Sequence, residues 1–164
     1  SNLRQLQQSD ELGLLLSALS DERKRLADQH GKRVPVALKI APDLDQAQIA
    51  IIADLLVTHG IDAVIATNTT IARDAVSTLP HGTEAGGLSG APLTTQAQAI
   101  TAQLAAALAG ALPIIGVGGI MNGGDAVARM AAGARLVQIY TGLVYGGPAL
   151  IRDCAQAIKD KASC

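Results

Sequence analysis

Two successive units of strand, glycine-rich turn and helix, within residues 113–148, restrict the fold of this chain more than any other feature. The first unit has an apolar strand at 113–117, a turn at Gly118-Gly119 and a helix over 125–132, which ends at Gly133. A strand, a helix and a second strand in this order predict a parallel sheet with the helices packed on it.

The second unit has an apolar strand at 136–139 and continues through Tyr140-Thr141 and Gly146-Gly147 to a helix that Pro148 opens. The carboxyl ends of parallel strands lie at the same edge of a sheet. The two turns can therefore bring backbone N–H groups close together, with helix N-termini behind them, and this suits a phosphate. The stretch is predicted to hold the phosphate of a cofactor.

Composition excludes several classes of protein. The chain has 164 residues, of which 49% are hydrophobic and 16% are charged, so we expect one packed domain over residues 1–164 and no membrane span. The net charge is −1 and the densest basic cluster is Arg23-Lys24-Arg25, so nucleic acid is not an expected partner. The charges at 21–25 are expected to form a solvated helix face. Two tyrosines are the only aromatic residues, and such an aliphatic core suits parallel strands covered by helices.

The cysteines and histidines indicate neither a metal site nor a disulfide framework. Cys154 lies in the last expected helix and Cys164 is the final residue, a count and spacing that fit neither. His30, His59 and His81 have no partners at ligand spacing and are expected at the surface or in loops. No Ser-His-Asp or Cys-His arrangement is evident, and a reducing compartment is expected.

The chain before these units also alternates helices and strands. A helix is expected up to Gly31, and a strand at 34–41 places Lys39 among small residues on one face and the larger apolar residues on the other. Asp45 and the glutamine three residues later have capping-box spacing, which predicts a helix over 46–58.

A second strand at 61–67 ends in the polar run 67–70, and a long connection then leads to a helix over 94–110. Connections of this length are usually functional or disordered. The pattern gives four β/α units preceded by one helix, which is about half of a (β/α)8 barrel. The chain is thus either a small open α/β domain or a fragment, and its open sheet edges could pair with a second copy.

Five motifs indicate a family more specifically than the alternation of strands and helices does. They are LKIAPDL at 38–44, IATNTT at 65–70, GGLSG at 86–90, PIIGVGGI at 113–120 and LVQIYTG at 136–142. Together they resemble dihydroorotate dehydrogenase, specifically the quinone-linked class 2 enzymes. The resemblance runs from about Leu3 to Ile158 and covers the carboxyl-terminal half of the family's TIM (β/α)8 barrel.

The resemblance implies a cofactor, FMN, and assigns residues to it. Lys39 matches the lysine that reaches the pyrimidine end of the flavin, where a fixed cation stabilises negative charge on the ring. Asn68 and Thr69 match residues that hydrogen-bond dihydroorotate or orotate. The remaining flavin contacts implied are Thr67, Ser89, Gly90, Gly118, Gly119, Tyr140 and Thr141.

The activity implied is oxidation of dihydroorotate to orotate in pyrimidine (UMP) synthesis, with hydride passing to the flavin and a quinone reoxidising it. The family's catalytic base, a serine, would lie just before Leu3, and the first four strands and the membrane-associating helices would lie farther upstream. No catalytic residue is therefore assigned within this chain, which is expected to be inactive alone and cytoplasmic, whereas its parent enzyme would be peripheral on the inner (cell) membrane. The alternatives are a half-barrel without flavin and another flavin or phosphate-binding barrel, such as a dihydropyrimidine or inosinate-type dehydrogenase.

Overall fold

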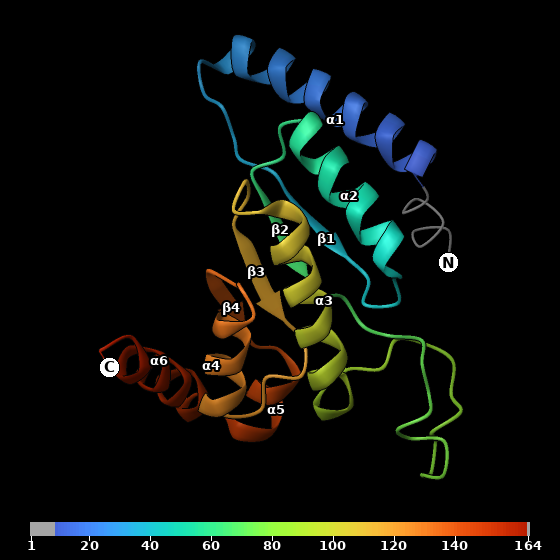
Figure 1. Cartoon of the computed structure of the whole chain (residues 1–164), viewed down its shortest axis with the longest axis vertical. Helices are drawn as coiled ribbons and strands as arrows, with labels where there is room; N and C mark the ends of the chain where they lie inside the picture. Colours follow the sequence, from blue (N-terminus) through green and yellow to red (C-terminus); the bar gives the residue numbers. More distant parts are fainter. Residues whose placement is uncertain (1–8, 164) are drawn as a thin grey trace.

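The structure, a computed structural model, describes residues 9–163 and has the expected four β/α units preceded by one helix (Figure 1). The elements in chain order are α1 Ser9–His30, β1 Ala37–Ile40, α2 Gln46–Thr58, β2 Ala63–Ala66, the short 3-10 helix η2 Ala91–Leu93, α3 Thr94–Leu108, β3 Ile114–Val117, α4 Gly123–Ala131, β4 Leu136–Gln138, α5 Thr141–Gly146 and α6 Ala149–Ala162. This arrangement confirms the α/β class predicted from the alternating pattern.

The four strands form one parallel sheet in the order β1-β2-β3-β4, so β1 and β4 are its edges. In the register of the sheet, Lys39 pairs with Ile65, Ile65 with Ile115, and Ile115 with Leu136. These four residues lie on the same face, which we call the inner face because it would line a closed barrel. Leu136 is 62% exposed there, so the inner face is largely uncovered.

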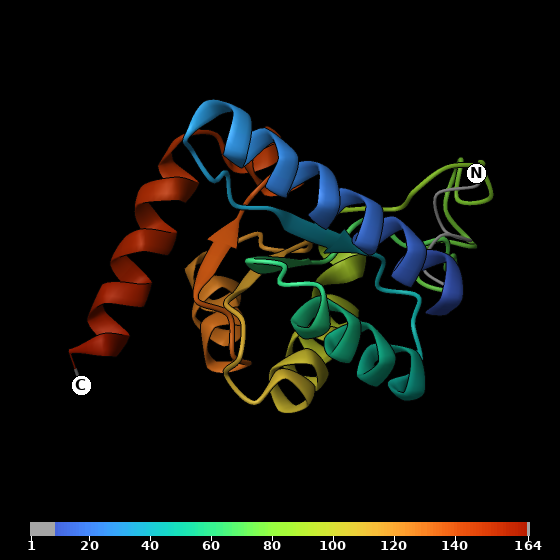
Figure 2. The same cartoon turned by 90° about the horizontal axis from the view of Figure 1, so that it is seen from above.

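The opposite face of the sheet carries the core. Ile40, Val64, Ala66 and Ile114 on this face are buried, and α2 and α3 cover them with an apolar layer that includes Leu104. In Figure 2, α2, α3 and α4 form a row on one side of the strands. A second, smaller cluster lies between α4 and α6, and it consists of Ile120, Ala126, Leu150 and Cys154.

Side-chain caps explain where two of the helices, α2 and α4, begin. The side chain of Asp45 accepts a hydrogen bond from the backbone N–H of Gln48 at 2.8 Å, and Gln48 returns one to the backbone N–H of Asp45 at 2.9 Å, so the predicted capping box is confirmed. Asn122 caps α4 in the same way, because its side chain accepts from the N–H of Asp125 at 3.0 Å. Helix α4 therefore begins at Gly123, two residues before the predicted start.

Two predictions of local structure were wrong. The segment between β4 and the last helix was expected to be a loop, but it forms the short helix α5, in which Gly142 is buried against the carbonyl of Ile120 and the side chain of Leu150. The first strand was expected at 34–41 but spans only Ala37–Ile40. Pro35 has no N–H to donate to a neighbouring strand, which accounts for the late start.

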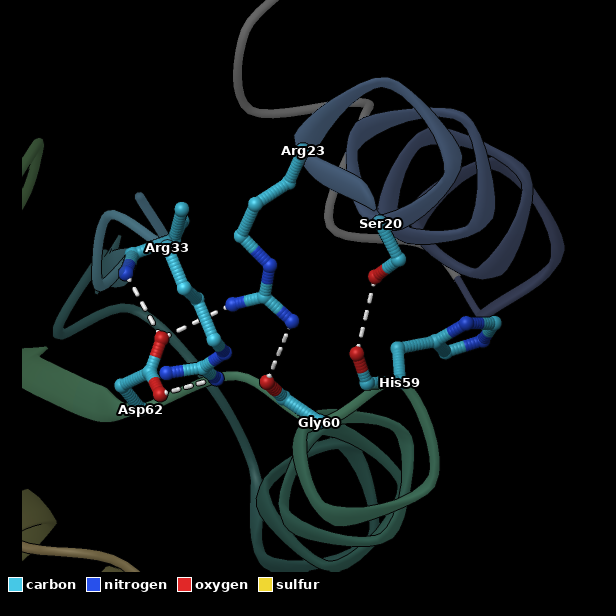
Figure 3. Close-up of polar contacts among 7 residues, drawn as sticks. Ser20, Arg23, Arg33, His59, Gly60 and Asp62 are labelled. Atoms are coloured by element: carbon cyan, nitrogen blue, oxygen red, sulfur yellow. Dashed lines mark hydrogen bonds and ion pairs between the residues drawn. The ribbon is translucent and has the colours of Figure 1, made fainter. Parts of the chain in front are cut away.

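Helix α1 packs against α2 and is fixed by a polar network at its carboxyl half (Figure 3). Ser20 donates to the carbonyl of His59 at 2.8 Å, while Arg23 donates to the carbonyl of Gly60 and to the carboxylate of Asp62, each at 2.8 Å. Asp62 also accepts from Arg33 and from the backbone N–H that follows Pro35. The expectation that the charges at 21–25 are all solvated was therefore wrong for Arg23.

The pKa of the Asp62 carboxyl is lowered from its ordinary value, first by the backbone N–H of Val36 and then by Arg33 and Arg23. The side chain of Asp62 is 23% exposed, so these partners act on a partly buried carboxylate. Within residues 9–163, none of the helices is long and apolar enough to cross a membrane.

Candidate functional site

A cavity of about 530 Å³ opens at the carboxyl edge of the sheet, within the size range of small-molecule sites. All ten residues that the sequence assigned to cofactor or substrate line it. They are Lys39 on β1, Thr67, Asn68 and Thr69 after β2, Ser89 and Gly90 in the long connection, Gly118 and Gly119 after β3, and Tyr140 and Thr141 after β4. The sheet thus brings together residues from five separate segments, as the motifs predicted.

The segment after β2 is held by its backbone. The N–H of Thr67 donates to the carbonyl of Val117 at 2.8 Å, and the N–H of Asn68 donates to the carbonyl of Ile40 at 2.7 Å. These bonds continue the sheet by one residue on each side, although the peptide between Ala66 and Thr67 is cis. Thr67 is 2% exposed, whereas Asn68 is exposed.

Hydrogen bonds within this segment decide which polar atoms can serve a ligand. The hydroxyl of Thr67 donates to the carbonyl of Asn68 at 2.9 Å, so its oxygen keeps a lone pair for a ligand donor. The side-chain oxygen of Asn68 accepts from the N–H of Thr69 at 2.8 Å, so its NH2 group is the end that can donate to a ligand acceptor.

The long connection between β2 and α3 leaves the site at Thr70 and returns to it at Leu88, where these two residues form an antiparallel bridge. Arg73 holds it together by donating to the backbone carbonyls of Glu84 and Gly86. A β-carbon on Gly87 would lie 1.9 Å from the hydroxyl oxygen of Thr69, so the connection passes this residue at a distance that only glycine allows. Farther along, the hydroxyls of Ser89 and Thr141 are hydrogen-bonded at 2.9 Å, which joins the connection to the end of β4.

The Gly118-Gly119 turn follows β3 with backbone φ angles of +100° and +69°, which favour glycine. The guanidinium of Arg129 on α4 lies behind it and donates to the carbonyls of Val117 and Gly118 at 3.0 and 2.9 Å. Thr94, the first residue of α3, donates from its hydroxyl to the carbonyl of Gly119 at 2.6 Å. The turn is thus fixed by side chains from two helices.

Arg129 is 1% exposed, and burial lowers the pKa of its guanidinium, while the nearby Asp125 raises it. Because the ordinary pKa of arginine is above about 12, the group stays charged at neutral pH. It was not recognised from the sequence, where an arginine in the last turn of a short helix reads as a surface residue that complements the helix dipole.

Only one of the two predicted glycine turns lines the cavity. Gly118 and Gly119 line the cavity, whereas Gly146-Gly147 lies at the end of α5 and does not. The helix N-terminus beside the first turn is that of α3 rather than that of the following helix, because a β-carbon on Gly119 would lie 2.3 Å from the backbone nitrogen of Thr94. The expected helix at Pro148 does follow the second turn, as α6, whereas the N-terminus beside the first turn belongs to a helix that precedes it in sequence.

Six further residues line the cavity and were not assigned from the sequence: Leu93, Val117, Ile120, Gln138, Ile139 and Gly142. Gln138 carried a signal that could have been used, because it is a polar residue at the end of an otherwise apolar strand. The apolar members carried none, since an apolar residue at a strand end looks the same whether it faces a core or a cavity. Among the described residues that line the cavity none is acidic, and Lys39 supplies a cation.

Outside this cavity, the candidates for chemistry in residues 9–163 are metal sites and reactive cysteines. No group of three His, Cys, Asp or Glu side chains there is placed to hold a metal ion. Cys154 is a free thiol in the core, its sulfur 3.5 Å from the carbonyl of Asn122, and burial raises its pKa. The serine base expected just before Leu3 lies outside the residues that the structure describes.

Comparisons with known proteins bear on the same motifs. A family model described as dihydroorotate dehydrogenase matches residues 1–161. Proteins named dihydroorotate dehydrogenase (quinone) from Thiobacillus denitrificans and Herminiimonas arsenicoxydans are 62% and 60% identical over 157 and 158 residues, which is 96% of this chain in each case. The chain spans about half the length of these curated relatives, 47% and 46%.

Solved structures give the same result for the fold. The dihydroorotate dehydrogenase of Eimeria tenella in complex with ferulenol has a TM-score of 0.89 and 34% identity, covering 96% of this chain and 46% of its own. Its ligand-free form gives 0.88 and 36%, with 47% of its chain covered. The motifs, the four β/α units and these similarities agree: the chain belongs to the dihydroorotate dehydrogenase family and forms part of a TIM barrel.

Proposed function

We propose that this chain supplies the FMN site, and part of the substrate site, of a quinone-linked dihydroorotate dehydrogenase. The observation that carries the proposal is the single cavity in which all ten assigned residues meet. Its donor set fits a phosphorylated, hydrogen-bonding ligand, because it combines a glycine turn, hydroxyls and one ammonium without a carboxylate among the described lining residues. A dihydropyrimidine or inosinate-type dehydrogenase would share the glycine turn but is not indicated by these comparisons.

The residues divide between two ends of the cavity. Gly118, Gly119, Tyr140 and Thr141 would hold the phosphate, since their strands are neighbours and their backbones lie at its edge. Lys39 would lie at the other end, on β1, where its charge would stabilise a negatively charged ring. Thr67, Ser89 and Gly90 would contact the flavin between these ends. When bound, FMN would supply the acceptor for a hydride.

The substrate is proposed to bind through Asn68 and Thr69. Because the side-chain oxygen of Asn68 is bonded to the N–H of Thr69, its NH2 group can donate to a ring carbonyl or a carboxylate of dihydroorotate. Thr69 packs against Gly87, so the long connection fixes the position of this pair. We further propose that the 164-residue polypeptide binds the cofactor without turnover, because it spans only about half the length of its curated relatives.

The test is a titration of the purified chain with FMN, followed by quenching of flavin fluorescence. We expect saturable binding that is weakened several-fold by Lys39→Met and is unchanged by Lys24→Met, which removes an exposed lysine on α1. The same preparation should give no dihydroorotate-dependent dye reduction. A colourless protein that does not bind FMN would favour a half-barrel without flavin instead, and measurable turnover would contradict the proposed inactivity.

The uncovered inner face favours a second proposal, that the sheet pairs with another four-stranded half through its edges β1 and β4. Ile65 and Ile115 on the two central strands are only partly buried there, and Leu136 on the edge strand β4 is 62% exposed, which leaves an apolar face without a cover. A second copy of this chain would offer the same two edges. Sedimentation velocity should then show a dimer that Leu136→Asp dissociates, and a concentration-independent monomer would oppose the proposal.

A further inference from the structure

Arg129 on α4 is a charged side chain in the interior, 1% exposed, beneath the turn that follows β3. Burying a charge is costly unless the group is compensated by hydrogen bonds. Its terminal nitrogens donate to the carbonyls of Val117, Gly118 and Thr94, at 3.0, 2.9 and 3.3 Å, whereas its Nε has no partner. The guanidinium is therefore bound mainly by backbone carbonyls of the turn and of the first residue of α3.

These bonds, together with the one from the N–H of Thr67 to the carbonyl of Val117, set the direction of the neighbouring amides. The peptides from Val117 to Gly118 and from Gly118 to Gly119 are trans, so each N–H points away from the carbonyl of its own peptide. Since both carbonyls face Arg129, the N–H groups of Gly118 and Gly119 point away from it, and both glycines line the cavity. The hydroxyl of Thr94 acts likewise on the carbonyl of Gly119, which directs the N–H of Ile120.

The charge also changes the strength of these donors. A cation bonded to a carbonyl polarises its peptide and makes the N–H at the other end a better donor, particularly where water is excluded. The chain makes room for this arrangement at Gly116 on β3, where a β-carbon would lie 2.3 Å from Cγ of Arg129. A lysine or methionine in place of the arginine could fill the stem but could not form the same set of bonds.

We propose that Arg129 is a positioning residue for an anion: it holds the Gly118-Gly119 turn with its amides directed into the cavity and polarises them toward the phosphate group of the bound nucleotide. This inference rests on the proposed function, since the ligand is FMN. Arg129 itself does not touch the ligand. It acts through the two peptides to which it is bonded.

The test compares FMN with riboflavin, which has the same ring and ribityl chain but no phosphate. Arg129→Met should weaken FMN binding by about tenfold or more and riboflavin binding by less than about twofold. Arg129→Lys, which keeps a charge, should recover part of the loss. Ile100→Val is the matched control, because it perturbs the buried core of α3 without touching the turn, and it should leave the ratio of the two dissociation constants unchanged.

A second readout needs no ligand. In the ligand-free protein, ¹⁵N relaxation should give order parameters near 0.85 for the amides of Gly118 and Gly119, falling toward 0.6 in Arg129→Met. Equal losses of FMN and riboflavin affinity, or unchanged order parameters, would overturn the positioning role. If the wild-type chain binds no FMN, the proposed function fails by itself, and the order parameters alone then decide whether Arg129 fixes the turn.

Discussion

The contact between Gly116 and Arg129 gives a sharp test of how the turn is built. A β-carbon on Gly116 would lie 2.3 Å from Cγ and 2.9 Å from Cδ of Arg129, and 3.1 Å from Cβ of Ala134. Carbon atoms in contact are normally about 3.5–4.0 Å apart, so Gly116→Ala would leave the first pair more than about 1 Å too close. The arginine cannot swing aside easily, because three carbonyls hold its guanidinium.

We therefore expect Gly116→Ala to lie at the upper end of the range for overpacking, about 3 kcal/mol in the free energy of unfolding. For a chain of this size, such a loss lowers the melting temperature by roughly 6–12 °C. Gly13→Ala is the matched control. It lies in α1, its β-carbon would be 3.6 Å from the nearest side-chain atom, and alanine favours the helix. Urea titrations at low temperature measure both changes.

A double-mutant cycle identifies the cause. Arg129→Ala removes both atoms closest to the added methyl group, so Gly116→Ala should cost less than about 1 kcal/mol in that background. The remaining approach, 3.1 Å to Cβ of Ala134, is tight, but a small shift of that residue relieves it. An equal cost in both backgrounds would refute the reasoning, because the strain would then not come from the arginine.

Two further predictions concern stability. Asp62→Ala removes the acceptor shared by Arg23, Arg33 and a backbone N–H, and should cost about 1–3 kcal/mol by urea titration at pH 7. Because the pKa of Asp62 is lowered on folding, its contribution is complete above the unfolded value near 3.9 and is lost as the pH falls through the folded value; a cost that persists unchanged at pH 2 would contradict this. Asp45→Ala removes the α2 capping box and should cost about 1 kcal/mol, whereas Asp54→Ala on the exposed side of the same helix should cost almost nothing, and equal costs would mean that the cap is not responsible.

The parts of the fold that the sequence predicts well are those determined by local chemistry. Helix α2 runs over the predicted 46–58, because Asp45 and Gln48 mark its start and Gly60 follows its end. The ten residues assigned to the site remain a prediction, but they do line one cavity, because most of them lie at the carboxyl ends of neighbouring parallel strands and the long connection brings Ser89 and Gly90 to the same edge.

The parts that the sequence did not predict are determined by contacts between distant segments. Arg23 belongs to a run of charges that looks solvated, and only the packing of α1 brings it to Asp62. Arg129 is hidden for a related reason, because its burial depends on how α4 meets the turn and the start of α3. In both cases the arginine is bonded to groups that are remote in sequence, so spacing carries no signal for it.

The two ends of the cavity differ in how firmly the described residues hold them in place. At the end of the cavity proposed for the phosphate, the Gly118-Gly119 turn is fixed by Arg129, by Thr94 and by the N–H of Thr67 after the neighbouring strand, and Gly119 is buried. At the end proposed for the flavin ring, Lys39 is exposed on an edge strand, and the inner face around it is uncovered. A preorganised turn loses little conformational entropy on binding, whereas an exposed lysine must be ordered by the ligand itself. The phosphate should therefore contribute more to the affinity of this chain for FMN than the ring does, and covering the inner face should strengthen mainly the contribution of the ring.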